Sequence, residues 1–159
     1  MVYFGYKGYK VVEMFVGQSI QSLDDKGRIV LKSKVRSQLT STTVYLLFDL
    51  GHCLSIYSED EYLIKAKEMS QLDDFNEDER ALKRIFFANS FETSIDKQGR
   101  IAIPKFLLSK AKIEKDVVVV GAFSHLQVYA LETFNNELAS YEDDYEALAS
   151  KVNAAKYAK

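Results

Sequence analysis

Two aspartate–arginine pairs are the residues of this chain whose types and spacing could do chemistry together. Asp24 and Arg28 lie four positions apart, and so do Asp96 and Arg100. Across a tight turn, the aspartate can accept hydrogen bonds from turn N–H groups while the arginine begins the next strand. A guanidinium fork held in this way matches the edges of guanine bases and the oxygens of phosphates. The pairs therefore suggest recognition of a nucleic acid.

Glycines and lysines belong to the same two turns. Gly27 and Gly99 precede the arginines, where the turn requires a positive φ that costs other residues energy. Lys26 and Lys97 add positive charge and are candidates for phosphate contacts. The residues predicted to bind DNA are Lys26, Arg28, Lys97 and Arg100, and those predicted to organise the turns are Asp24, Gly27, Asp96 and Gly99.

A simpler interpretation makes each pair an exposed ion pair that stabilises its turn and contributes little else. Duplication favours the binding interpretation. Sliding the sequence by 72 residues places 22–29 on 94–101 with five identities in eight positions. The longer comparison of 19–62 with 91–134 gives 8 identities in 44 positions, so the identity is concentrated in the octet. Two copies at this spacing are a tandem pair, because a solenoid needs three or more shorter units.

Enzyme chemistry finds little support in the sequence. Each aspartate has an arginine partner that keeps it ionised, which does not suit general acid or base work. His52 and His125 are too few for a metal site. The single cysteine, Cys53, has no partner for a disulfide, which indicates a reducing, cytoplasmic environment. No dinucleotide-binding, P-loop or nucleophile-elbow motif occurs, so we predict no catalytic residue, metal, cofactor or small-molecule substrate, and no enzyme activity.

The composition is that of an ordinary globular chain of 159 residues, with a net charge of −2 that argues against a uniformly basic nucleic-acid coat protein. The charge alternates along the chain: 19–58 and 91–131 each carry +2, whereas 59–79 carries −7 and 132–146 carries −6. Each basic repeat is thus followed by an acidic stretch. No apolar run approaches the roughly 20 residues that span a bilayer, so no membrane partner is expected.

Each copy is predicted to fold as strand, turn, strand, short helix, strand, turn, strand, helix. The first three strands are expected over 15–23, 28–31 and 44–48 in one copy and over 91–95, 100–103 and 117–121 in the other. Alternation after the turn places Ile29 inward and Arg28 outward, and likewise Ile101 inward and Arg100 outward.

Helix signals lie between and after these strands. Pro104 suits the first turn of a short helix, and Ser33 is expected to cap the counterpart in the first copy. Asn76 opens a capping box for a linker helix. The predicted divisions are an N-terminal extension outside the fold (1–13), repeat 1 (18–60), linker helices (61–88), repeat 2 (89–132) and a C-terminal helix and tail (133–159).

Apolar residues recur at helical spacing in both helical regions, which fits packing on the core or on a neighbouring subunit. The residues are Leu82, Ile85, Phe86 and Phe87 in the linker and Phe134, Leu138, Tyr141, Tyr145 and Leu148 near the C-terminus. The acidic stretch 132–146 is open to two interpretations, a solvated helix face or a surface that binds a partner.

The doubled motif resembles the MraZ family. The runs 14–17 and 23–29 are similar to the start of that family, the run 95–104 is similar to its second motif, and the resemblance extends from Met14 to about Tyr141. It implies an α+β, mainly β fold of the AbrB/SpoVT class, in which two tandem βαβ-type halves interlock as a swapped-hairpin β-barrel with peripheral helices. The first copy departs from the family at Lys32 and its neighbours, where a proline is usual.

The resemblance also implies a function. MraZ proteins are bacterial transcriptional regulators, usually repressors, that bind short G-rich direct repeats upstream of the cell-division and cell-wall gene cluster as ring-shaped homo-oligomers. The family motifs map onto Asp24 and Arg28 and onto Asp96 and Arg100. The expected partners are double-stranded promoter DNA and further copies of the chain, in the cytoplasm at the nucleoid. The alternative is an oligomeric scaffold that binds proteins and whose arginine motifs are structural.

Overall fold

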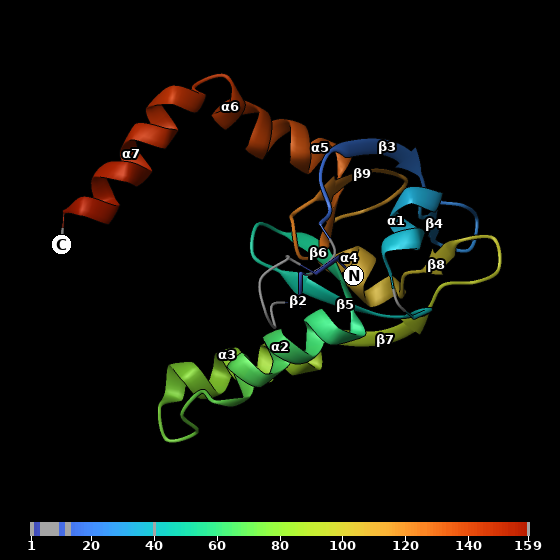
Figure 1. Cartoon of the computed structure of the whole chain (residues 1–159), viewed down its shortest axis with the longest axis horizontal. Coiled ribbons are helices and arrows are strands. Elements are labelled where there is room, and N and C mark those ends of the chain that lie inside the picture. The colour runs from blue at the N-terminus through green and yellow to red at the C-terminus, as the bar shows by residue number, and fades with distance from the viewer. Residues whose placement is uncertain (1, 4–9, 12–13, 40, 159) are drawn as a thin grey trace.

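The computed structural model describes residues 2–3, 10–11, 14–39 and 41–158 of the chain (Figure 1). Its strands are β1 (Val2–Tyr3), β2 (Lys10–Val11), β3 (Gln18–Ser22), β4 (Arg28–Val30), β5 (Thr43–Asp49), β6 (Cys53–Ser58), β7 (Ser90–Ser94), β8 (Arg100–Ala102), β9 (Asp116–Gly121) and β10 (Leu126–Ala130). Its helices are α1 (Ser33–Gln38), α2 (Glu59–Ser70), α3 (Glu77–Ala88), α4 (Lys105–Lys110), α5 (Leu131–Thr133), the π-helix η1 (Phe134–Leu138), α6 (Ala139–Glu142) and α7 (Tyr145–Tyr157).

The main sheet has six antiparallel strands in the order β3-β9-β10-β6-β5-β7, and both repeats contribute to it. β3 of the first repeat pairs with β9 of the second, and β7 of the second repeat pairs with β5 of the first. The two remaining strands, β4 and β8, pair with each other as a separate ribbon. Each repeat therefore supplies an edge strand to the other.

Two registers identify a pseudo-two-fold axis between the repeats. Ser55 pairs with Gln127 at the centre of the sheet, and Ile29 pairs with Ile101 at the centre of the ribbon. Both pairs join residues that are equivalent at the repeat offset of 72. Residues that pair with their own equivalents lie on a symmetry axis, so the duplication in the sequence becomes a rotation in the fold.

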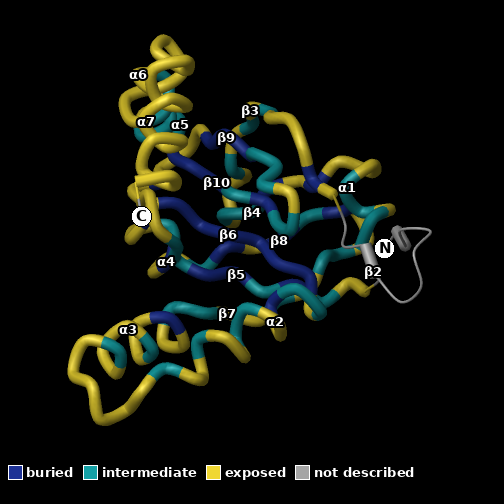
Figure 2. The backbone as a smooth tube through the Cα atoms, turned by 60° about the vertical axis from the view of Figure 1, so that its left-hand side comes forward, coloured by how far each residue is buried: buried dark blue, intermediate teal, exposed yellow. Residues whose placement is uncertain are grey.

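The two faces of the sheet carry different apolar clusters. Figure 2 shows that the buried parts of the backbone lie mostly along the central sheet strands, whereas the helices are mostly exposed. On one face, the ribbon and the short helices α1 and α4 enclose the larger core, in which Ile29 and Ile101 are completely buried, as predicted. On the other face, α2 and α3 cover a smaller cluster that contains Tyr62 and Phe86. The sheet strands are thus covered on both sides where β5 and β6 run, and β6 is buried along its whole length.

The described strands form an open sheet and a ribbon, so the closed swapped-hairpin barrel predicted from the resemblance is not confirmed. No backbone strand pairing joins β3 to β4 in this part of the chain. The side chain of Gln21 takes that role, since its Nε2 donates to the Val30 carbonyl at 3.0 Å and its Oε1 accepts from the Val30 N–H at 2.8 Å. The halves are also not parallel βαβ units, because all described strand pairs are antiparallel.

Two predicted helix starts shift by one residue. Lys32 and Pro104 are the N-cap residues of α1 and α4, so Ser33 is the first helical residue and not the cap. The end of the ribbon sets both helix starts. Leu31 and Ile103 still donate backbone hydrogen bonds across the ribbon, to the carbonyls of Gly99 and Gly27. The chain can therefore leave the ribbon only at the next residue.

Asn76 caps α3 as predicted, since its side chain accepts from the Glu79 N–H at 3.0 Å. The first strand of the repeat begins at Gln18, later than predicted, because Gly17 adopts a φ of +84° and Phe15 forms an isolated bridge to Phe123. Within the predicted extension, β1 and β2 pair with each other, and residues 1, 4–9, 12 and 13 lie outside the described part of the chain.

Candidate nucleic-acid interface

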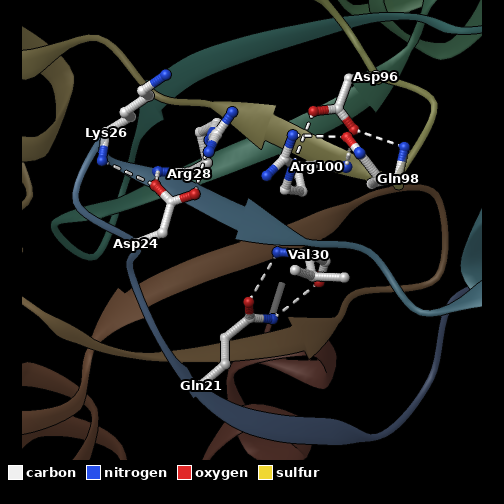
Figure 3. A network of polar contacts seen from close by, with 8 residues as sticks. All are labelled: Gln21, Asp24, Lys26, Arg28, Val30, Asp96, Gln98 and Arg100. Carbon is white, nitrogen blue, oxygen red and sulfur yellow. Dashed lines mark hydrogen bonds and ion pairs between the residues drawn. The ribbon is translucent and has the colours of Figure 1, made fainter.

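The first turn is organised by the carboxylate of Asp24 (Figure 3). Its Oδ1 accepts hydrogen bonds from the backbone N–H groups of Lys26 and Arg28, each at 2.9 Å. Its Oδ2 accepts from the Arg28 Nε at 2.6 Å. Gly27 closes the turn with a φ of +72° and donates its N–H to the Asp24 carbonyl at 3.0 Å. One carboxylate thus holds both the turn and the arginine.

The second turn repeats this geometry around Asp96. Its Oδ1 accepts from the N–H groups of Gln98 and Arg100 at 2.9 Å, and its Oδ2 accepts from the Arg100 Nε at 2.8 Å. One contact has no equivalent in the first turn, because the Nη2 of Arg100 also donates to the Oε1 of Gln98 at 2.6 Å. Gly99 has a φ of +79°, as the turn requires. The second guanidinium is therefore held more firmly than the first.

Both aspartates are stabilised in their charged form. Burial raises the pKa of Asp24, but the hydrogen bonds from Arg28 and from the Lys26 N–H outweigh it, so the pKa lies below its usual value. At Asp96 the backbone N–H of Arg100 is the largest influence, and the pKa is again lowered. An acid catalyst needs the opposite shift, a raised pKa. Both carboxylates are therefore favoured in the charged form, in which they accept hydrogen bonds from the arginines.

The ribbon brings the two arginines together on one face. Arg28 lies opposite Ala102, and Arg100 lies opposite Val30, so all four side chains point to the same side. Ile29 and its partner point to the other side, into the core. Figure 3 shows both guanidinium groups above neighbouring strands, between the two aspartates. The hydrogen bond from each Nε sets the direction of its guanidinium group, and in Arg100 the Nη2 is engaged as well, with Gln98.

The predicted lysines lie at non-equivalent positions of the two turns. At the 72-residue offset, Lys26 aligns with Gln98, and Lys97 aligns with Asp25. Both lysine side chains are exposed beside their arginines. The structure thus brings the predicted DNA-binding residues to two adjacent turns. The symmetry of the arginines does not extend to the lysines.

A third arginine, which sequence reasoning missed, lies over the second turn. Arg36 of α1 packs so closely on Gly99 that a Cβ atom added there would lie 2.7 Å from the arginine Nε. That Nε is buried and has no hydrogen-bond partner among the described residues. The equivalent of Arg36 is Leu108, whose Cδ1 would lie an ordinary 3.5 Å from a Cβ atom added at Gly27. The repeat alignment could have drawn attention to this arginine, because it pairs Arg36 with a leucine.

The histidines and the cysteine do not form a site. His125 stacks on Tyr57 with ring centroids 4.4 Å apart, His52 is exposed, and Cys53 is buried. Burial raises the pKa of the Cys53 thiol to about 11, which makes it unreactive. No group of three or more potential ligands is placed to hold a metal ion anywhere in the described residues. None of the described helices has the length and apolar character needed to cross a membrane.

Comparison with known proteins gives a consistent result. The model of the family described as "MraZ protein, putative antitoxin-like" matches residues 14–85 and again 86–154, one match for each repeat. The transcriptional regulator MraZ of Clostridium tetani is 36% identical over 140 residues, which cover 88% of this chain and 97% of that protein.

Two further proteins called transcriptional regulator MraZ are similar to the chain over the same region. The Carboxydothermus hydrogenoformans protein is 32% identical over 87% of the chain and 96% of its own length. The Caldanaerobacter subterraneus protein is 34% identical over 88% of the chain and 97% of its own length. This chain therefore belongs to the MraZ family, whose members are transcriptional regulators and not enzymes.

Proposed function

We propose that this regulator binds double-stranded promoter DNA with the face of the ribbon that carries Arg28 and Arg100. The observation that carries the proposal is that two partly exposed guanidinium groups, each anchored by an aspartate, lie on the same face of the ribbon. Anchoring reduces the entropy lost when an arginine docks on a guanine edge or a phosphate. Lys26 and Lys97 contribute phosphate contacts beside them. Asp24, Gly27, Asp96 and Gly99 hold the turns.

The target sequence is proposed to be a set of short G-rich direct repeats upstream of the cell-division and cell-wall gene cluster, where binding represses transcription in the cytoplasm at the nucleoid. One chain offers too few phosphate contacts for tight binding at physiological salt. Several copies in a ring engage successive repeats, and effective concentration then multiplies weak contacts. In this proposal, 18–60 and 89–132 form the swapped-hairpin unit, 61–88 and 133–159 are peripheral, and 1–13 lies outside it.

A mobility-shift titration tests the proposal. DNA with G-rich direct repeats is compared with scrambled DNA of the same composition, at two salt concentrations. Arg28→Ala and Arg100→Ala are each expected to weaken repeat-specific binding by about 1–3 kcal/mol per lost guanine contact, with the oligomer size unchanged. Lys67→Ala removes an exposed cation on α2, away from the ribbon, and serves as the control.

The salt series separates the two functions considered. Equal binding of repeat and scrambled DNA at both salt concentrations would favour the protein-binding scaffold, with structural arginines. Unchanged affinity and salt dependence in both arginine variants would refute the proposed interface directly, because each lost phosphate contact lowers the salt slope by about one.

A further inference from the structure

The C-terminal helix α7 exposes apolar residues that no described part of the chain covers. It extends away from the sheet (Figure 1), and all of its described residues with a burial class are exposed. Tyr145, Leu148 and Val152 are 73%, 37% and 51% exposed, and their spacing places them on one side of the helix. A helix of 13 residues is marginally stable in water by itself. These side chains, with Ala155, are called the α7 strip below.

The helix equivalent to α7 in the first repeat buries a residue against a neighbouring helix, whereas α7 buries none. At the 72-residue offset, the counterpart of α7 is α3, the second helix of the linker pair. α3 folds back beside α2 and buries Phe86, whose ring lies 6.0 Å from that of Tyr62. α7 has no buried residue at all. The same element is thus anchored in the first repeat and uncovered in the second.

The outer side of α3 offers a matching apolar surface. Leu82 and Ile85 are 49% and 55% exposed, and Ala81 and Ala88 are exposed beside them. Helical spacing places Ala81, Ile85 and Ala88 on one side of α3, with Leu82 at its border, four positions before the buried Phe86. These four exposed residues form the α3 strip.

The charges along both helices favour one relative orientation. α3 begins with the acidic residues 77–79 and continues with the basic residues Arg80, Lys83 and Arg84. The chain entering α7 is acidic over 142–146, and its later part is basic, with Lys151 and Lys156. An antiparallel arrangement places the acidic start of α3 beside the later, basic part of α7. A parallel arrangement would place acid beside acid, which is unfavourable.

We propose that the α7 strip of one copy packs antiparallel on the α3 strip of the next copy. The two helices are attached to opposite edges of the sheet, because α3 leads into the edge strand β7 whereas α5, at the start of the C-terminal helices, packs against β9 near the other edge. A contact between different surfaces is head-to-tail, and repetition of such a contact gives a ring when the rotation between successive copies closes. The inference rests on the ring in the proposed function and assigns its interface.

Sedimentation velocity of the full-length chain tests the contact. Leu148→Asp combined with Val152→Asp places two charges in the α7 strip, and we expect the concentration needed for assembly to rise by about a hundredfold or more. The matched control is Ser150→Asp with Ala154→Asp, which adds the same charges to the opposite side of the same helix. This control is expected to keep the wild-type mass.

Mixing two defective chains tests the head-to-tail geometry. Leu82→Asp with Ile85→Asp damages the α3 strip and leaves the α7 strip intact. Each double variant alone is expected to be monomeric. In an equimolar mixture, the intact α7 strip of one variant can pack on the intact α3 strip of the other. The mixture is therefore expected to form a heterodimer and nothing larger. A contact within one chain, or between two identical surfaces, cannot produce this result.

The outcomes distinguish this inference from the function on which it rests. A wild-type ring that keeps its mass in the Leu148→Asp/Val152→Asp variant would overturn the α7 interface and leave the ring and the DNA proposal standing. A wild type that is monomeric at all concentrations would overturn both the interface and the ring. A mixture that stays monomeric would overturn the head-to-tail arrangement. Binding of a single DNA repeat by the monomeric variant, lost on Arg28→Ala, reports on the proposed function independently.

Discussion

Each turn aspartate accepts three hydrogen bonds, two from backbone N–H groups and one from an arginine Nε. A single side chain therefore couples the shape of the turn to the direction of the guanidinium. This role explains why an aspartate lies in a surface that is proposed to bind DNA, which is negatively charged. The charge of the aspartate costs some attraction for phosphate, but it fixes the geometry on which recognition of a base edge depends.

The two turn glycines are expected to respond differently to substitution by alanine. Gly27→Ala introduces strain at positive φ, about 1 to 2 kcal/mol, without a steric conflict, because its new Cβ meets atoms at 3.5 Å. Gly99→Ala causes the same backbone strain, and its new Cβ must also displace Arg36. It is therefore expected to destabilise the fold by up to about 1 kcal/mol more than Gly27→Ala. Urea denaturation of both variants measures the difference.

Arg36→Ala provides the control for this comparison. In a chain that carries Arg36→Ala, Gly99→Ala is expected to lower the free energy of unfolding by no more than Gly27→Ala does, because the side chain that the new Cβ displaces is absent. An excess that persists without Arg36 would show that the second turn is strained for another reason.

His125 is expected to make stability depend on pH. Burial lowers the pKa of His125 below its ordinary value of about 6.5, so the unfolded chain binds a proton at a higher pH than the folded chain. Stability is therefore full above about pH 6.5 and falls as the pH drops through this value, by at most about 1.4 kcal/mol per pH unit. Thermal unfolding between pH 5 and 7.5 measures the slope.

His125→Phe keeps an aromatic ring against Tyr57 and removes the titrating group, so it is expected to flatten this part of the profile. An equal slope in wild type and His125→Phe would assign the acid sensitivity to other groups.

At the scale of elements, α2 and α3 attach to the sheet through stacked aromatic rings. Tyr45 and Tyr62 stack at 4.2 Å, and Phe86 follows Tyr62 at 6.0 Å. Phe86→Ala is expected to cost about 3–5 kcal/mol, because it opens a cavity in this cluster. Phe75 is 97% exposed, so Phe75→Ala is expected to change stability by less than about 0.5 kcal/mol. Equal losses in a denaturant titration would contradict the packing described for α3.

At the scale of the whole molecule, neither repeat can complete its sheet alone. β3 pairs with β9, β7 pairs with β5, and the ribbon needs one strand from each half. A chain of residues 14–88 therefore leaves these pairings open. We expect it to be unfolded when dilute and to form a homodimer when concentrated, with each copy taking the place of the missing half.

Circular dichroism and light scattering over a concentration series check this expectation for the half-chain. A folded monomer of residues 14–88 would show that the exchange of strands is not required for stability. The intact chain, whose folding does not depend on such an association, provides the comparison.

The local parts of the proposed interface follow from the sequence alone. Asp24, Gly27 and Arg28 lie within one turn, so the hydrogen bonds among them depend on neighbouring residues, and their recurrence 72 residues later identifies the repeat. The inward direction of Ile29 and the cap at Asn76 are predictable for the same reason, because alternation and capping are local rules.

Tertiary structure alone decided which strands pair and which side chains meet across the repeats. The residue patterns of β3, β5, β7 and β9 are compatible with hairpins inside each repeat as well as with the observed exchange. The choice depends on the total apolar area that the whole chain buries, and no short segment encodes it. Two contacts follow from that choice. Arg36 packs on Gly99, and the side chain of Gln21 bonds to the backbone of Val30 in place of a strand partner. The sequence by itself determined the two arginine turns, and long-range pairing placed them side by side.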